Sequence, residues 1–137
     1  MSLIISSDAP LAREKLAAMP VQALAFVGDA VYSLLVREYL AEAHPDRRNL
    51  HNLSVAEVNC RAQSEAAQLL LPLLSEEETA VYKRGRNNTA STPPKKAEVT
   101  DYRRATGVEA LFGWLYLAGK GERINELFSA VRETLIQ

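Results

Sequence analysis

Two acidic residues stand alone inside apolar segments, and their side chains are the first candidates for chemistry. Asp29 is the only charged residue in the run 21–36, and Glu109 is the only charged residue in the run 105–117. A carboxylate removed from water without a partner costs several kcal/mol. Neither segment supplies a cation at helical spacing from its acid. The pattern predicts that a third group, such as a hard metal ion, joins the two carboxylates.

Small residues surround both acids and leave room for a ligand or a second backbone. They are Gly28 and Ala30 beside Asp29, and Ala110, Gly107 and Gly113 near Glu109. Carboxylate oxygens suit Mg²⁺, which takes one or two from protein and completes its shell with water and phosphate. The alternative is an ordinary buried acid paired with Arg103, Arg104 or another distant base. The isolation of the acids leaves both interpretations open.

A basic stretch precedes the segment that carries Glu109. Its cationic and amide residues are Lys83, Arg84, Arg86, Asn87, Lys95 and Lys96. Such a loop, which also contains glycine, can bind phosphates through side chains and backbone N–H groups. A solvated run of charge is the alternative, and composition alone favours it. The order along the chain favours phosphate binding, because the loop leads directly into the Glu109 segment.

Composition describes a globular protein with no overall basic character. The chain has 137 residues, is 47% hydrophobic and carries a net charge of −1, so affinity for nucleic acid must come from a local patch. We expect one domain over residues 1–137. The single cysteine, Cys60, excludes an internal disulfide and a cysteine metal cluster. We see no signal peptide or membrane span and expect a cytoplasmic protein.

The apolar periodicity is helical almost throughout, which predicts an all-α bundle. Ser75 and Glu78 form a capping-box pattern, Gly85 suggests a helix end, and Gly119 suggests another. Residues 86–97 read as a loop. The expected helices cover 11–19, 21–43, 54–74, 75–85, 98–118 and 122–136, with a short helix before the third.

Several motifs then resemble the catalytic domain of ribonuclease III. Phe26 to Tyr32 reads Phe-Val-Gly-Asp-Ala-Val-Tyr, like the signature whose aspartate binds the catalytic metal, and residues 106–117 resemble the second acidic helix. The similarity is closer to Mini-III, the small bacterial ribonuclease subfamily without a double-stranded-RNA-binding domain. Its blocks resemble residues 83–87, 94–95 and 102–111 here.

The resemblance implies a homodimeric, all-α ribonuclease III-like endonuclease. It implies that Asp29 and Glu109 are catalytic metal ligands for Mg²⁺, for which Mn²⁺ can substitute. The implied substrate is double-stranded RNA, specifically the 23S rRNA precursor, cut to leave a 5′-phosphate and a 3′-hydroxyl. Phe26 would insert across the two-fold axis into the partner subunit. A ribosomal protein partner and an intramolecular place for Phe26 both stay open.

The chain departs from the pattern of the larger enzymes. Ala25 and Thr106 stand where two further acids would be, and Gln22 occupies a commonly acidic position. Similar losses are usual in Mini-III, although they leave the number of metal ions open. One alternative function is a non-catalytic dimer of the same fold that binds RNA or the ribosome. Another is a helical bundle for protein interaction, which leaves the two lone acids unexplained.

Overall fold

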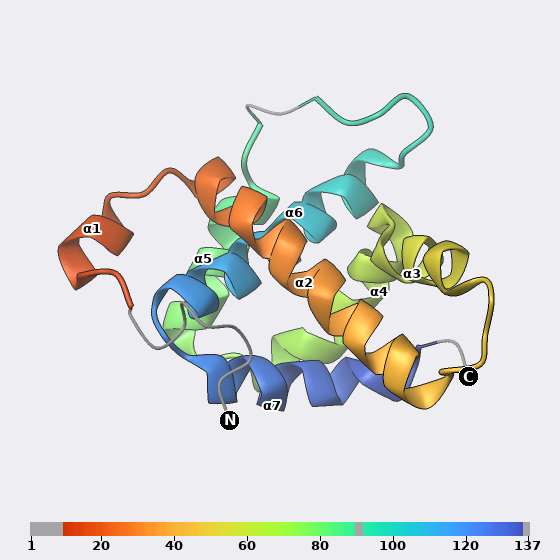
Figure 1. Cartoon of the computed structure of the whole chain (residues 1–137). Coiled ribbons are helices and arrows are strands. Elements are labelled where there is room, and N and C mark those ends of the chain that lie inside the picture. The colour runs from red at the N-terminus through yellow and green to blue at the C-terminus, as the bar shows by residue number, and fades with distance from the viewer. Residues whose placement is uncertain (1–9, 90–91, 136–137) are drawn as a thin grey trace.

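The structure is a computed structural model that describes residues 10–89 and 92–135. Over these residues it contains helices and no strand, so the all-α prediction is confirmed (Figure 1). The elements are α1 (Arg13–Ala17), α2 (Val21–Ala43), α3 (Leu50–Val58), α4 (Cys60–Leu70), the short 3₁₀ helix η2 (Leu71–Leu73), α5 (Glu76–Arg86), α6 (Val99–Leu117) and α7 (Gly121–Arg132).

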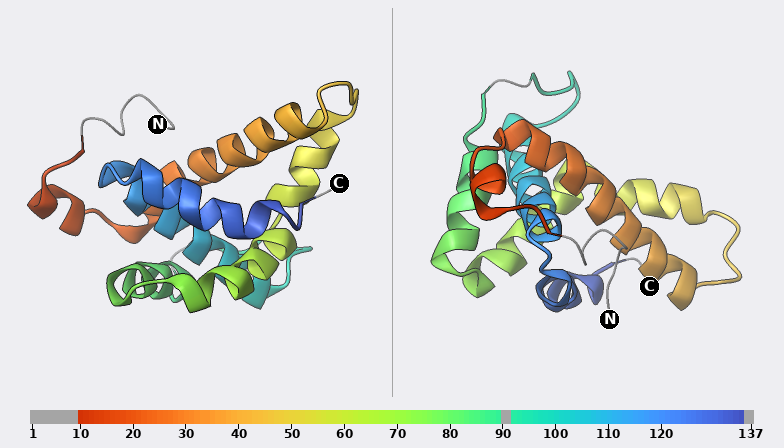
Figure 2. Two further views of the ribbon diagram at one scale, coloured as in Figure 1. Left: turned by 90° about the horizontal axis from the view of Figure 1, so that it is seen from below. Right: turned by 60° about the vertical axis from the view of Figure 1, so that its left-hand side comes forward.

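Helix α6 is the centre of the core. It packs against α2, α5 and α4, and α2 crosses in front of it in Figure 1. Seen from below in Figure 2, α2 lies on one side of α6 and α7, and the α4–α5 pair lies on the other. The residues from Ala110 to Leu115 are all buried, because a central helix has neighbours on nearly every face. No helix in residues 10–89 and 92–135 has the length and apolar character needed to cross a membrane.

Two glycines bring the backbones of α2 and α6 into contact. A Cβ atom added at Gly28 would lie 1.6 Å from the backbone oxygen of Glu109. A Cβ at Gly113 would lie 1.9 Å from the backbone oxygen of Leu24. The expectation that small residues beside the acids admit another backbone is therefore correct. Since Gly28 precedes Asp29, this crossing also sets the relative position of the two acids.

Gly85 does not end its helix as predicted. Helix α5 continues to Arg86, and Gly85 is buried where α5 crosses α6. A Cβ at Gly85 would lie 2.8 Å from the Cβ of Ala110, so the glycine is needed for close packing. Gly119 does follow the end of α6 and has φ 75°, a conformation that favours glycine, as predicted.

The helix predicted over 54–74 is two helices and a 3₁₀ turn. Asn59 has extended backbone (φ −71°, ψ 166°) and separates α3 from α4. Its side chain accepts a hydrogen bond from the Ala62 backbone N–H and so caps α4. The preceding short helix that was expected is thus α3 itself, which begins at Leu50.

The other boundaries differ from prediction mainly at helix ends. The predicted span of α2 matches Val21–Ala43, and the capping box at Ser75 is present with both of its hydrogen bonds. Helix α1 is shorter than expected, and α7 ends at Arg132 rather than at residue 136. Ile136, the predicted last residue of that helix, lies outside the described residues.

Candidate active site

The crossing of α2 and α6 places the side chains of Asp29 and Glu109 together. The two carboxyl groups are close enough to share a hydrogen bond. Asp29 is exposed to solvent and Glu109 is half-buried, so the pair lies at the surface end of a core contact. The structure thus brings together the two acids that the sequence singled out, although 80 positions separate them.

The electrostatic environment of Glu109 disfavours its charge. Burial, the hydrogen bond with Asp29 and repulsion from Asp29 raise the pKa of Glu109 to about 8, while a hydrogen bond from Gln63 acts in the opposite direction. None of the ion pairs among the described residues includes either acid. The alternative, in which Arg103 or Arg104 neutralises one of the two acids, is therefore wrong for the residues that the structure describes.

A third polar side chain, which sequence analysis did not identify, completes the surroundings of Glu109. Gln63 on α4 is 2% exposed. Its Nε2 donates to the Val58 backbone oxygen at 2.8 Å and to Glu109 Oε2 at 3.4 Å. Its Oε1 is buried and has no hydrogen-bond partner. A signal was present in the sequence, because Gln63 falls at helical spacing on the apolar stripe of Ala66, Ala67 and Leu70.

These residues fit a hard divalent cation. Two adjacent carboxylates offer only oxygen donors, the type that Mg²⁺ prefers. The described residues contain no group of three or more His, Cys, Asp and Glu side chains suited to a metal. Two protein carboxylates suffice for Mg²⁺, because water and substrate phosphate complete its coordination shell.

Cys60 lies near this site but is not a candidate nucleophile. It is partly buried at the start of α4. Burial and the negative charges of Glu109 and Asp101 raise the pKa of its thiol. A raised pKa keeps the thiol protonated and unreactive.

The predicted RNA-binding residues of α5 lie beside two further arginines. Lys83 and Arg84 are exposed, and Arg84 donates to the Met19 backbone oxygen at 3.3 Å. Arg86 stacks over the Tyr82 ring at 5.9 Å. A cavity of about 270 Å³ is lined by Arg86, Asn87, Val99, Thr100, Arg103 and Arg104. Arg103 and Arg104 follow the basic stretch in sequence, and the structure places them in this cavity rather than beside the two acids.

Lys95 and Lys96 belong to a different part of the surface. Both are exposed, and Lys96 lines a cavity of about 420 Å³ that also includes Asn59, Cys60, Arg61, Pro94, Ala97, Glu98 and Asp101. This cavity adjoins the start of α4, and none of the α5 residues lines it. The basic residues that are continuous in sequence therefore form two groups in the structure.

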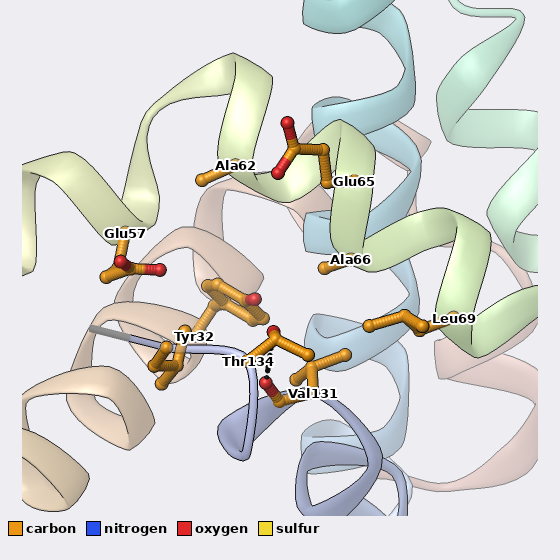
Figure 3. Close-up of a pocket in the computed structure, with 9 residues that line it drawn as sticks. Tyr32, Glu57, Ala62, Glu65, Ala66, Leu69, Val131 and Thr134 are labelled. Carbon is orange, nitrogen blue, oxygen red and sulfur yellow. Dashed lines mark hydrogen bonds between the residues drawn. The ribbon is translucent and has the colours of Figure 1, made fainter. Parts of the chain in front are cut away.

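A separate pocket of about 260 Å³ lies between α4 and α7, and Figure 3 shows its lining. Glu57, Ala62, Glu65, Ala66 and Leu69 come from the α3–α4 side, and they face Tyr32, Val131 and Thr134. Leu135 also lines the pocket. Burial and the negative charge of Glu57 raise the pKa of Tyr32. Neither Asp29 nor Glu109 lines this pocket, so we assign the candidate chemistry elsewhere.

Phe26 projects from α2 into solvent and is 82% exposed. The alternative of Phe26 as an intramolecular core residue is therefore wrong. It lies one helical turn before Asp29 and Ala30, which are also exposed. Helix α2 thus buries one face against α6 and leaves a large aromatic side chain uncovered beside the acid pair.

Comparisons with known proteins agree on one family. Residues 22–120 match the model of the Ribonuclease III domain. A Mini-ribonuclease 3 of Thermoanaerobacter sp. (strain X514) is 44% identical over 118 residues, which cover 85% of this chain and 83% of that protein. A Mini-ribonuclease 3 of Brevibacillus brevis is 47% identical over 105 residues, which cover 76% and 78% of the two chains. A crystal structure of a Fusobacterium nucleatum protein superposes with a TM-score of 0.77 at 30% identity, covering 88% of this chain and 97% of the other.

Proposed function

The chain belongs to the ribonuclease III family, and from that premise we propose that it is a divalent-metal-dependent endoribonuclease that cleaves double-stranded RNA. The observation that carries the proposal is the contact between the carboxyl groups of Asp29 and Glu109, with no described cation paired to either. Two adjacent acids repel each other and weaken the fold, which is expected where a cation is to be bound. In this proposal residues 1–137 form one catalytic domain.

Asp29 and Glu109 would hold the metal ion, Mg²⁺ or in its place Mn²⁺. When bound, the ion would supply charge stabilisation at the scissile phosphate and a lowered pKa for an attacking water. The chain contributes the position of the two carboxylates, fixed by the backbone contact at Gly28 and Gly113. In-line attack on phosphorus would leave a 5′-phosphate and a 3′-hydroxyl.

The basic residues would bind the phosphates of the duplex. Proteins recognise A-form RNA mostly through its shape, 2′-hydroxyls and phosphates. We assign this role to Lys83, Arg84, Arg86, Asn87, Lys95 and Lys96. The exposure of Lys83, Arg84, Lys95 and Lys96, and the arginine-lined cavity beside Arg86 and Asn87, support the assignment.

The salt dependence of RNA binding tests this assignment. Replacing Arg84 and Arg86 together by alanine should weaken binding and lower the slope of log K against log salt by roughly 1–2, since about two phosphate contacts are lost. The matched control is Arg132→Ala, an exposed arginine on α7. An unchanged slope in the double variant would show that these two residues do not contact phosphates and would favour the alternative of a solvated run of charge.

The enzyme would act as a homodimer with Phe26 at the two-fold axis. An aromatic ring that is 82% exposed on an apolar helix supports burial in a partner, and two-fold symmetric contact is the commonest arrangement of homodimers. Sedimentation velocity should show a dimer for the wild-type protein and a shift to monomer for Phe26→Ala. Leu73→Ala, at another exposed apolar position, should remain dimeric. A dimer that survives Phe26→Ala would exclude this interface.

The proposed substrate is the 23S rRNA precursor, which places the protein in the cytoplasm. The support is the resemblance of the motifs to those of the Mini-III subfamily. The test is incubation of the wild-type protein with a structured precursor and Mg²⁺, with and without ribosomal protein, followed by mapping of the RNA ends. Paired cuts near the mature ends are expected, and Asp29→Asn should abolish them. Binding without cleavage at any Mg²⁺ or Mn²⁺ concentration would instead favour the non-catalytic RNA-binding dimer.

A further inference from the structure

The side chain of Gln63 connects the break between two helices to the acid pair. Helix α3 ends at Val58. Because Asn59 interrupts the helix, the backbone oxygen of Val58 is not part of the backbone hydrogen-bond pattern of α4. Gln63 Nε2 supplies the missing donor at 2.8 Å, and the same nitrogen donates to Glu109 Oε2 at 3.4 Å. One amide group on α4 therefore ties the end of α3 to a carboxylate on α6.

The orientation of this amide follows from its neighbours. The Val58 backbone oxygen can only accept a hydrogen bond, so the NH₂ side must face it, and the same nitrogen reaches Glu109. The oxygen Oε1 is then left buried without a donor. A buried acceptor without a partner costs about 1–3 kcal/mol. The fold alone gives no reason for this cost, because the rest of the stripe is apolar.

A hydrated cation would supply the missing donor. Mg²⁺ in proteins usually keeps several of its waters, and their O–H groups need acceptors around the site. The unpartnered Oε1 belongs to the same amide group whose nitrogen contacts Glu109. The known behaviour of metal sites agrees, since residues that hold a ligand carboxylate by hydrogen bonds set much of the metal affinity.

We propose that Gln63 is a positioning residue of the metal site, whose Nε2 orients the Glu109 carboxylate and whose Oε1 accepts a hydrogen bond from a water of the hydrated cation. The inference rests on the proposed function, because it assumes that Asp29 and Glu109 bind a divalent metal. It assigns to α4 a part in a site that was predicted from residues of α2 and α6 alone.

The first experiment measures metal affinity without RNA. Mn²⁺ binding by electron paramagnetic resonance and Mg²⁺ binding by calorimetry are compared for the wild-type protein, Gln63→Leu and Ser64→Ala. Ser64 is a matched control, because it is buried on the same helix and makes no described hydrogen bond to either acid. We expect metal binding about 10–100-fold weaker in Gln63→Leu and unchanged in Ser64→Ala.

Cleavage assays then separate positioning from a structural effect. In Gln63→Leu, kcat should fall at limiting Mg²⁺ and recover as the Mg²⁺ concentration rises, while KM for RNA stays close to that of the wild-type protein. A loss of helix packing would not be reversed by metal. A folded Gln63→Leu variant with wild-type metal affinity would overturn the proposal.

The second experiment uses the wild-type protein and does not depend on the folding of a variant. The side-chain amide resonance of Gln63 should shift with Mg²⁺ along the same saturation curve as calorimetry, whereas that of exposed Gln68 on the same helix should not. Metal binding with an unmoved Gln63 resonance would refute this inference and leave the proposed function intact. No metal binding by the wild-type protein would refute both.

Discussion

Two glutamates of this protein, Glu78 and Glu109, are held in opposite ways. Glu78 is 5% exposed and receives hydrogen bonds from Arg123 Nε and Nη2, each at 2.8 Å. The Ser75 backbone N–H donates to it at 2.9 Å. These contacts, chiefly the hydrogen bonds from Arg123, hold the pKa of Glu78 below its usual value. Glu109 instead faces another acid, Asp29, and its pKa is raised to about 8.

The difference follows from the position of each acid in its helix. Glu78 lies in the first turn of α5, where backbone N–H groups are free and the helix dipole favours negative charge. Glu109 lies in the middle of α6, where the helix itself uses the backbone donors. The fold therefore stabilises the charge of the structural acid and leaves the charge of the candidate catalytic acid to be stabilised by a ligand.

The largest expected effect concerns activity and tests the two roles directly. Glu109→Gln should lower kcat for cleavage of duplex RNA by about 100–1,000-fold or more, since it removes one of two metal ligands. Glu78→Gln should leave kcat per folded molecule unchanged, because Glu78 does not contact the site. Single-turnover cleavage, corrected for the folded fraction by circular dichroism, measures both. Equal losses in the two variants would remove the distinction between the acids.

The next effect concerns stability. Arg123→Met should lower the free energy of unfolding by about 3 kcal/mol, because Glu78 keeps its burial but loses its cation. Arg123 also donates to the Leu73 backbone oxygen at 2.8 Å and pairs with Glu126, so several contacts are lost together. Urea unfolding at pH 7 measures the change, and Arg132→Met, an exposed position on α7, is the control. A loss below about 1 kcal/mol would mean that Glu78 is held by its capping box alone.

The smallest effect is a pH dependence with a defined sign. The folded state holds a proton on Glu109 up to about pH 8, whereas the unfolded state releases it near pH 4.5. The folded state therefore binds more protons between these values, and stability falls as the pH rises through them. Glu109→Gln removes this loss and should be more stable than the wild-type protein by roughly 1–2 kcal/mol above pH 8, allowing for solvent screening.

Unfolding curves in EDTA at pH 5 and pH 8.5 measure this effect. The variant and the wild-type protein should differ little at pH 5, where Glu109 is protonated in the folded state. They should diverge at pH 8.5. An equal difference in stability between the variant and the wild-type protein at pH 5 and pH 8.5 would show that the contact with Asp29 does not disfavour the charge of Glu109.

Local features of the fold were predictable because they depend on residues within a turn of one another. The span of α2, the Ser75 capping box and the end of α6 at Gly119 belong to this class. The prediction of one helix over 54–74 was wrong because an asparagine such as Asn59 can either continue a helix or cap the next one. The prediction for Gly85 was wrong for a similar reason, since a glycine that ends a helix and one that allows close packing of a neighbouring helix are indistinguishable in sequence.

The sequence by itself determined the all-α class, the two lone acids and the small residues that let their helices meet. Only the tertiary structure decided which acid obtains a cation and which does not. Arg123 reaches Glu78 across 45 positions, and Gln63 reaches Glu109 across 46. The tertiary structure also separated Arg86, which shares a cavity with Arg103 and Arg104, from Lys96, which lines another. The physical reason is that hydrogen bonding and burial depend on distance in space, and helix packing sets that distance between residues that are far apart in sequence.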